Sequence, residues 1–326
     1  MRLIQYPSAK ANPKGFASVK HPVKILLLSA LLGLQGCALV PALPPEAVSS
    51  AQQQSSIELK DVPFFSQEDY FCGPSSLAMV LNHQGARTNP QDLAKFVYVP
   101  DRKGSLQIEM LAAPRQFGQL AYQLEPNAQS LFNALNAGYP ALVLLNLSLQ
   151  IAPQWHYAVV VGYGADKNTI VLRSGKNERE EMPLATFVKL WERSKNWGFA
   201  VIKPDATVPA FATAQNYLNA VVGLERADAS NALLAYQRGA DAWPNEPWFY
   251  FGAGNIHFAA KRYIEAEQSF SKAVSVYPDM ADAWNNLAET QLQLGRKNEA
   301  CAAINKAISL GGKHIATYRE TAQKIN

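Results

Sequence analysis

Residues 62–67 read VPFFSQ, and after four further residues the chain continues at residues 72–79 with CGPSSLAM. The apolar spacing from Pro74 to His83 predicts a helix, so Cys72 stands at its start. Unpaired backbone N–H groups and the helix dipole at that end favour a thiolate over a thiol. Because acyl transfer needs a thiolate nucleophile, we interpret Cys72 as a catalytic nucleophile with a depressed pKa. The alternative is a small buried side chain, the usual fate of a free cysteine.

A histidine suited to act as the base follows later in the chain. His156 comes directly after a polar turn at residues 153–154 and begins an expected strand at residues 157–163. A histidine at a strand edge can face a helix N-terminus across a cleft and serve as base and then as acid. An incidental surface histidine is the alternative. We therefore expect Cys72 and His156 to form a pair.

The segment around this pair changes from helical to strand patterns. Apolar spacing predicts helices at residues 74–83, 91–96, 106–117 and 128–137. Short runs rich in Val, Leu and Ile predict strands at residues 140–147, 157–163, 169–172 and 198–202, with a hairpin turn at residues 164–168. Helices followed by an antiparallel sheet imply an α+β domain over residues 57–204.

Gln67, Cys72 and His156 together resemble the bacteriocin-processing peptidases of the double-glycine-leader type and their stand-alone relatives, a family of papain-like cysteine peptidases. In those proteins a Gln shortly precedes Cys-Gly-Pro, a helix follows, and a His comes before a hydrophobic strand. The resemblance covers roughly residues 59–204. It implies that Gln67 donates to the oxyanion, that Cys72 attacks the scissile carbonyl and that His156 moves the proton.

The chain departs from that family at the acid that orients the histidine. The relatives carry an Asp at the end of the next strand, whereas residues 170–175 read IVLRSG. Ser174 occupies the position of the acid, Asp166 lies earlier in the hairpin turn, and Asn177 lies just beyond. A hydroxyl or an amide can orient His156 but stabilises the imidazolium less than a carboxylate does. With Ser174 as the candidate orienting residue, we expect either a slow enzyme or a protein without catalysis.

From residue 213 the sequence repeats with a period of 34 residues. The coinciding columns are Ala232, Ala266 and Ala300; Tyr236, Phe270 and Ile304; Gly239, Ala273 and Ala307; and Pro244, Pro278 and Gly312. Small residues let paired helices approach, larger ones fill the space between pairs, and Pro ends the second helix. The pattern resembles the tetratricopeptide repeat, a generic helical bundle being the alternative. It predicts repeats at residues 213–246, 247–280 and 281–314, a capping helix at residues 315–326, and a linker at residues 205–212. Within this region, Pro204 to Pro209 is expected to act as a hinge.

The N-terminal region has the pattern of a bacterial lipoprotein signal. Five basic residues precede an apolar run at residues 25–34, which is too short to span a bilayer. The pattern predicts a signal peptide at residues 1–36, acylation of Cys37, and a flexible tether at residues 37–56. An ordinary secretory signal is the alternative. Because Ala38 follows the cysteine, resemblance to enterobacterial lipoproteins implies a lipid anchor in the bacterial envelope, on the periplasmic face of the outer membrane.

Composition argues against several other classes of function. The net charge is +4, but without the predicted signal peptide 25 basic residues face 26 acidic ones, so nothing indicates a nucleic-acid partner. With Cys37 acylated, the two remaining cysteines are too few for a cysteine-rich zinc site, and we expect neither a metal nor a cofactor. Cys72 and Cys301 are expected to stay unpaired because they fall in different domains.

These patterns predict a thiol peptidase that cleaves a peptide or protein in the envelope, with the repeats binding a partner protein or the substrate. Two alternatives stay open. One is a non-catalytic adaptor whose papain-like domain binds a peptide, and the other is an amide-transfer enzyme in which an amine resolves the acyl-enzyme. The retained Cys72 and His156 favour catalysis, whereas the absent acid favours the adaptor.

Overall fold

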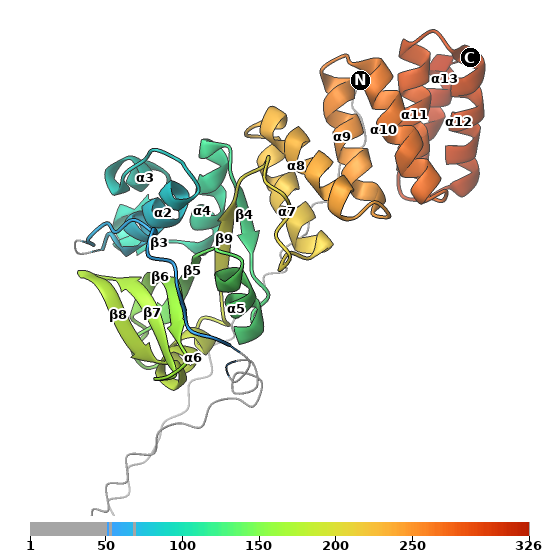
Figure 1. Ribbon diagram of the computed structural model, residues 1–326. Helices are drawn as coiled ribbons and strands as arrows, with labels where there is room; N and C mark the ends of the chain where they lie inside the picture. Colours follow the sequence, from blue (N-terminus) through green and yellow to red (C-terminus); the bar gives the residue numbers. More distant parts are fainter. Residues whose placement is uncertain (1–50, 52–53, 68–69, 326) are drawn as a thin grey trace, which may run out of the picture.

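The computed structural model describes residues 51, 54–67 and 70–325 (Figure 1). The predicted signal peptide, the acylation site Cys37 and most of the tether lie outside the described residues. A part that contains a sheet is followed by a row of paired helices leading to the C-terminus (Figure 1). The prediction of an α+β domain followed by an all-α repeat domain is therefore confirmed. No helix of the described part has the length and apolar character to cross a membrane.

A seven-stranded antiparallel sheet forms the centre of the first part, in the order β4-β9-β5-β6-β7-β8, with β1 paired to β6 off this path. Its strands are β1 (Ile57–Glu58), β4 (Leu120–Gln123), β5 (Ala141–Asn146), β6 (Trp155–Gly164), β7 (Thr169–Ser174), β8 (Asn177–Pro183) and β9 (Gly198–Ile202). A separate two-stranded sheet pairs β2 (Tyr98–Val99) with β3 (Gly104–Ser105).

Helices cover both faces of the larger sheet. Side chains of its central strand β6 point alternately to the two faces, and those on both faces are apolar and buried. Tyr157 and Val159 join the core under α2, whereas Ala158 and Val160 join the core under α5 and α6. The helices of this part are α2 (Cys72–His83), α3 (Pro90–Val97), α4 (Gln107–Ala112), α5 (Ala128–Asn136) and α6 (Leu184–Glu192), with 3-10 segments at Pro100–Arg102 and Ala113–Phe117.

The predicted helices are present with one difference. The helix expected at residues 106–117 is divided into α4 and a 3-10 segment, because Pro114 has no N–H to donate and its ring disfavours a continuous helix. Asn89 caps α3 as its sequence suggests, with its side chain accepting a hydrogen bond from the N–H of Asp92 at 2.9 Å.

The sequence patterns miss the strands β4 and β8, the helix α6 and the two-residue strands β1, β2 and β3. Strand β8 reads NEREEMP and is mostly exposed. It pairs only with β7 among the described strands, so it is an edge strand, and charged side chains are common at such edges. The sequence of β8 has no alternation of apolar and polar residues, so its pattern does not predict a strand.

The N-terminal strand β1 pairs antiparallel with β6 at Gly162, next to a bulge in the pairing of β6 with β7. A Cβ at this position would lie 2.4 Å from the carbonyl oxygen of Ile57, so only glycine permits the approach of β1. The N–H of Leu59 then donates to the carbonyl of Val161 at 2.8 Å.

The C-terminal helices form antiparallel pairs that lie within the predicted 34-residue units. They are α7 (Ala214–Glu225), α8 (Ala229–Ala242), α9 (Pro247–Ala259), α10 (Tyr263–Val276), α11 (Ala281–Gln293) and α12 (Lys297–Leu310), and α13 (Ile315–Ile325) follows the last pair. A Cβ at Gly239 would lie 2.3 Å from the ring of Phe249, and one at Gly254 would lie 2.6 Å from the ring of Phe270. The recurring small residues therefore make room for aromatic rings between helices.

The first repeat shares a core with the sheet-containing part, and no hinge separates them. Helix α7 lies beside β4 (Figure 1), and Tyr217 on α7 belongs to the same buried cluster as Tyr122 on β4. Phe211, in the expected linker, makes edge contacts with the rings of Tyr122 and Tyr139. The N–H of Thr213 donates to the Tyr122 hydroxyl at 2.9 Å. The expectation of a hinge is therefore wrong, because this segment is held by aromatic packing and a hydrogen bond.

Candidate functional site

Cys72 is the first residue of α2, as the sequence predicts, and its side chain is half-buried. The next position requires glycine, because a Cβ at Gly73 would lie 2.3 Å from Oγ of Ser105 on β3. The small sheet thus packs directly on the first turn of α2. Cys72 and Cys301 are both free cysteines.

Burial raises the pKa of the Cys72 thiol above its ordinary value. Hydrogen bonding from the backbone of Tyr157, Gly73 and Cys72 itself acts in the opposite direction but is the smaller effect. The prediction of a depressed pKa is therefore wrong for the resting protein, because desolvation of the thiolate outweighs the stabilisation that the helix start provides. At neutral pH the side chain is a thiol.

His156 lies near the start of β6, opposite Leu145 of β5. Its Nε2 is 3.1 Å from Oγ of Ser174, the buried last residue of β7. Ser174 pairs with Asn177 across a tight turn in which Gly175 has a φ of +59°, in the left-handed region. The Ser174 hydroxyl therefore contacts the imidazole at the position where the bacteriocin-processing peptidases have an Asp.

Burial lowers the pKa of His156, and the negative charge of Glu180 on β8 partly opposes this shift. The imidazole is therefore neutral at pH 7 and able to accept a proton. The other acid considered from the sequence, Asp166, lies in the β6–β7 turn at the opposite end of β6 from His156.

Gln67 is buried, and its side-chain amide is held at both ends. Its Oε1 accepts a hydrogen bond from the N–H of Gly175 at 3.0 Å, and its Nε2 donates to the Ser76 hydroxyl at 3.2 Å. The Ser76 hydroxyl donates in turn to the carbonyl of Tyr157 at 3.1 Å. Because an amide nitrogen carries two hydrogens, Nε2 keeps a second N–H for another acceptor.

These bonds bring the N-terminal half of α2, the start of β6 and the end of β7 together at Gln67. His156 directly precedes Tyr157, whose backbone hydrogen-bonds the Cys72 thiol. Within the described residues, no hydrogen bond joins the Cys72 thiol to the His156 ring. The four predicted site residues thus lie in one region of the fold, with thiol and imidazole not joined in the resting state.

Sequence reasoning missed three contributors to this region, namely Ser76, Gly175 and Glu180. A signal for Ser76 is available, because it is a polar residue on a face of α2 that is otherwise apolar and fully buried. Gly175 is distant in sequence from Gln67, and Glu180 is distant in sequence from His156. The segment that contains them is charged and has no motif, so only strand pairing shows that they lie near the site.

A cleft of about 640 Å³ opens beside the site. Trp155 and Tyr157, the neighbours of His156, line it, and so does Ser105, which packs against the start of α2. The Tyr157 hydroxyl donates to the carbonyl of Ser105 at 3.2 Å, which joins the two walls. The lining includes both chain neighbours of His156, whereas the side chains of His156 and Cys72 are not part of it.

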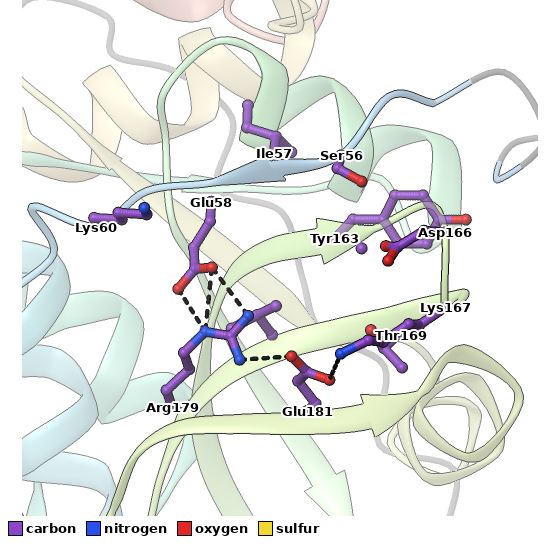
Figure 2. Close-up of a pocket in the computed structure, with 12 residues that line it drawn as sticks. Ser56, Ile57, Glu58, Lys60, Tyr163, Asp166, Lys167, Thr169, Arg179 and Glu181 are labelled. Atoms are coloured by element: carbon purple, nitrogen blue, oxygen red, sulfur yellow. Dashed lines mark hydrogen bonds and ion pairs between the residues drawn. The ribbon is translucent and has the colours of Figure 1, made fainter.

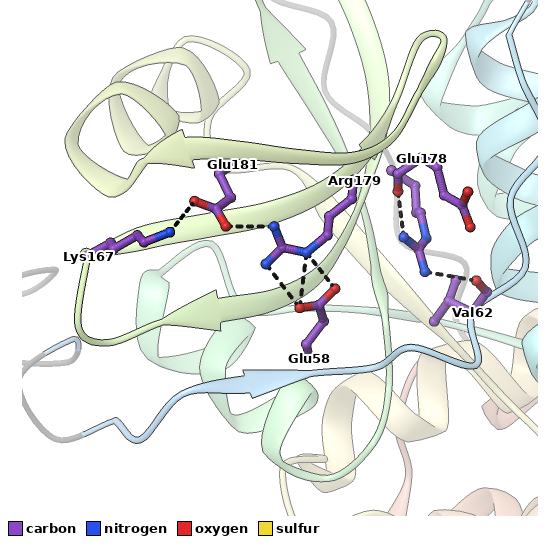
Figure 3. Close-up of polar contacts among 7 residues, drawn as sticks. Glu58, Val62, Lys167, Glu178, Arg179 and Glu181 are labelled. Atoms are coloured by element: carbon purple, nitrogen blue, oxygen red, sulfur yellow. Dashed lines mark hydrogen bonds and ion pairs between the residues drawn. The ribbon is translucent and has the colours of Figure 1, made fainter.

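A second hollow, of about 360 Å³, lies at the other end of the β6–β7 hairpin (Figure 2). Arg179 donates there to Glu58 at 2.9 Å and to Glu181 at 2.6 Å, and Lys167 donates to Glu181 at 3.3 Å (Figure 3). Hydrogen bonds from Arg179 and then Lys167 hold the pKa of the Glu181 carboxyl below its usual range. This network ties β1 to β8, and we assign it a structural role.

Among the described residues, no group of His, Cys, Asp and Glu side chains is arranged to hold a metal ion.

Comparison with known families divides the chain in the same way as the structure. Residues 59–198 match the Peptidase_C39 like family, and residues 217–275 and 257–321 match tetratricopeptide repeat models. A curated relative, the tetratricopeptide repeat-containing protein trd-1 of Caenorhabditis elegans, is 27% identical over 78 residues. That stretch is 24% of this chain and 10% of the worm protein.

Solved structures resemble each part separately. A C39-like peptidase from Bacillus anthracis has a TM-score of 0.40 at 16% identity, over 46% of this chain and 98% of that chain. The first tetratricopeptide domain of Spaghetti (RPAP3), bound to the HSP90 peptide SRMEEVD, has a TM-score of 0.33 at 18% identity, over 34% and 91%. The TPR2B domain of yeast Sti1, in complex with pHsp70, has a TM-score of 0.30 at 17% identity, over 34% and 89%. Gln67, Cys72, His156 and Ser174 all fall inside the segment that matches the peptidase family.

Proposed function

Since the chain joins a Peptidase_C39-like domain to tetratricopeptide repeats, we propose that it is a thiol peptidase that acts on a peptide or protein in the bacterial envelope. Cys72 is the nucleophile, His156 the base and then the acid, and Gln67 the oxyanion donor. The observation that carries the proposal is the amide of Gln67, which is fixed at both ends between Ser76 on α2 and Gly175 after β7. A preorganised donor of this kind can stabilise a developing oxyanion without reorganising during the reaction.

In the proposed reaction, proton transfer accompanies attack, because the resting pair is a thiol and a neutral imidazole. His156 accepts the thiol proton through Nδ1 while the sulfur forms a bond to the scissile carbonyl carbon. As negative charge develops on the carbonyl oxygen, this oxygen accepts a hydrogen bond from the second N–H of Gln67. The C–N bond then breaks, the amine leaves with the proton from His156, and water attacks the thioester to release the acid and restore Cys72.

Ser174 orients the imidazole in this scheme through the contact with Nε2. A neutral hydroxyl stabilises the imidazolium less than a carboxylate does, so we expect slow turnover. Glu180 supplies part of the missing negative charge from β8, since its charge raises the pKa of His156.

For the repeat domain we propose the binding of a partner protein or of the substrate itself. Tetratricopeptide repeats typically bind peptide or protein partners, and the matching models cover residues 217–275 and 257–321. We also propose that Cys37 is acylated, so that the chain is anchored to the periplasmic face of the outer membrane. The support for this anchor comes from the sequence of residues 25–38 alone.

A non-catalytic peptide-binding adaptor is the second candidate, favoured by the raised pKa of Cys72 and by the hydroxyl in place of a carboxylate. An amide-transfer enzyme would use the same acyl-enzyme with an amine in place of water. A thiol-reactive peptide probe on the full chain separates the peptidase from the adaptor. Labelling at Cys72 that is lost in His156→Ala supports the enzyme, with Cys301→Ser as the control for the other free thiol. Labelling that is unchanged in His156→Ala contradicts it.

A further inference from the structure

One wall of the cleft that Trp155 and Tyr157 line is apolar. Tyr157 and Trp197 contact each other with ring centroids 5.9 Å apart, and Leu144 lines the same wall. Trp155 also lines the cleft, yet 49% of its surface is exposed. A large aromatic side chain exposed at a cleft provides contact area for a ligand at low entropic cost.

The other end of the cleft carries positive charge. Arg193 and Lys195 both line it, and no acidic side chain is found among the described residues of the lining. Arg193 donates to the carbonyl of Asn146 at 3.2 Å and to the carbonyl of Ser148, so its position is fixed. Lys195 is exposed, and the hydrogen bonds and ion pairs of the described residues give its ammonium no partner.

The turn that presents Lys195 is rigid. Lys195 and Asn196 have φ values of +61° and +53°, and their N–H groups donate to the carbonyls of Glu192 at 2.8 Å and Trp191 at 3.1 Å. The side chain of Asn196 also donates to the carbonyl of Pro126 at 2.8 Å. The backbone under the ammonium is thus held in place before any ligand binds, which reduces the ordering cost of binding.

Exposed apolar side chains gather on both rims of this cleft. On one side Leu106 lines it, and Ile108 follows two residues later with 66% of its surface exposed. On the other side Leu147 and Leu149, both exposed, line a shallow hollow that shares Arg193 with the cleft. Ile151, in the same loop, is 91% exposed. Such concentrations of exposed apolar surface mark binding sites more often than ordinary surface.

We propose that this cleft is the substrate subsite, and that it selects a peptide with a large apolar side chain next to the scissile bond and a carboxylate further along. The apolar side chain packs between Trp155 and Trp197, and the carboxylate pairs with Lys195 and Arg193. The carboxylate is that of an Asp or Glu side chain or of the peptide C-terminus. This inference rests on the proposed function, because it assumes that the bond to be cleaved lies at Cys72.

Binding can be measured without cleavage on the full chain carrying Cys72→Ala. The probes are fluorescein-labelled decapeptides with one Phe and, two to four residues away, a Glu, Gln or Lys, each made with a free or an amidated C-terminus. We expect the Glu peptide to bind about fivefold more tightly than the Gln peptide, the effect of one partly exposed charge pair. If peptides with a free C-terminus bind more tightly than amidated ones and the Glu and Gln peptides bind equally, the carboxylate that the cleft recognises is that of the C-terminus.

Matched variants in the same background test the residues. Lys195→Glu should remove the preference for Glu and favour the Lys peptide, whereas Lys203→Glu, at the far end of β9, should change neither. Trp155→Ala should weaken binding of the Phe peptide, with Tyr277→Ala as a control at a similarly exposed aromatic residue in the repeats. Affinities that ignore peptide charge, or that respond equally to the Lys195 and Lys203 changes, overturn the inference.

The inference and the proposed function fail in different ways. If a probe labels Cys72 with dependence on His156 while decapeptide binding ignores charge, the peptidase stands and the subsite falls. If Cys72 does not label but binding follows charge and Lys195, the cleft recognises its peptide and the peptidase falls in favour of the adaptor.

Discussion

The Nε2 atom of His156 lies 3.1 Å from the Ser174 hydroxyl, so the position at which the resembling family has an acid is occupied by a neutral group in direct contact with the imidazole. A hydroxyl fixes the ring through one hydrogen bond but brings no charge. This contact separates two properties that a carboxylate combines, namely orientation and stabilisation of the imidazolium.

Replacement of Ser174 tests both properties. Ser174→Ala should lower the rate of Cys72 labelling by up to about tenfold, because one neutral hydrogen bond that orients the base is lost. Ser174→Asp should raise the pKa of His156 and increase peptide cleavage. The measurements are labelling rates and turnover against pH, with circular dichroism to verify the fold. Equal rates for Ser174→Ala and the unmodified chain would show that this hydroxyl does not position His156.

The pH dependence of labelling follows from the directions of the two pKa shifts. Burial raises the pKa of Cys72 and lowers that of His156, so the uncharged pair predominates near neutrality. Alkylation by a small reagent such as iodoacetamide should therefore rise with pH beyond about 8.5, the ordinary value for a thiol. The check is the rate at Cys72 between mildly acidic and alkaline pH in a Cys301→Ser background. A plateau of high reactivity below neutral pH would instead indicate a preformed thiolate and imidazolium.

Substitution of Gln67 should separate peptide hydrolysis from simple alkylation. Gln67→Glu keeps an oxygen to accept the Gly175 N–H but removes the N–H donors, and it should lower turnover about 10²- to 10³-fold. Alkylation by iodoacetamide forms no oxyanion and should change little. Thermal unfolding of the same variant controls for lost stability. A parallel loss of both reactions would assign Gln67 a structural role instead.

The shared core predicts that the sheet-containing part and the first repeat unfold together. Phe211→Ala removes the ring that contacts Tyr122 and Tyr139, and it should lower the free energy of unfolding by about 2–4 kcal/mol. Ile264→Ala, at an exposed position in α10, serves as the control. Calorimetry should show a single transition for both parts in the unmodified chain. Separate transitions, with Phe211→Ala affecting neither, would restore the hinge.

Acylation of Cys37 is predicted from the sequence alone. The mature protein expressed in a bacterium should partition into detergent and carry a diacylglycerol on Cys37, which intact-mass analysis would detect. Cys37→Ser should release the chain into the aqueous phase. Cleavage at another position, or recovery in the inner membrane, would contradict the predicted anchor or its sorting.

Much of this fold can be predicted from local patterns. The helix at Cys72 follows from apolar spacing and an early proline, and the paired C-terminal helices follow from a 34-residue period. Both signals arise from side chains that contact near neighbours in the chain, so they can be read without the tertiary structure. Strand β8 could not be predicted, because an exposed edge strand is held by pairing with β7 and carries no apolar pattern.

By itself the sequence determined the two-part organisation and the residue types of the candidate site, Gln67, Cys72 and His156. Only the tertiary structure decided the protonation of Cys72, since its pKa depends on how many atoms from distant segments exclude water from the thiol. The same holds for the shared core around Phe211, where polar and proline-rich neighbours suggest a hinge but aromatic rings more than 70 residues away hold the segment. Desolvation and long-range packing depend on what surrounds a residue in space, and that information is absent from its neighbours in the chain.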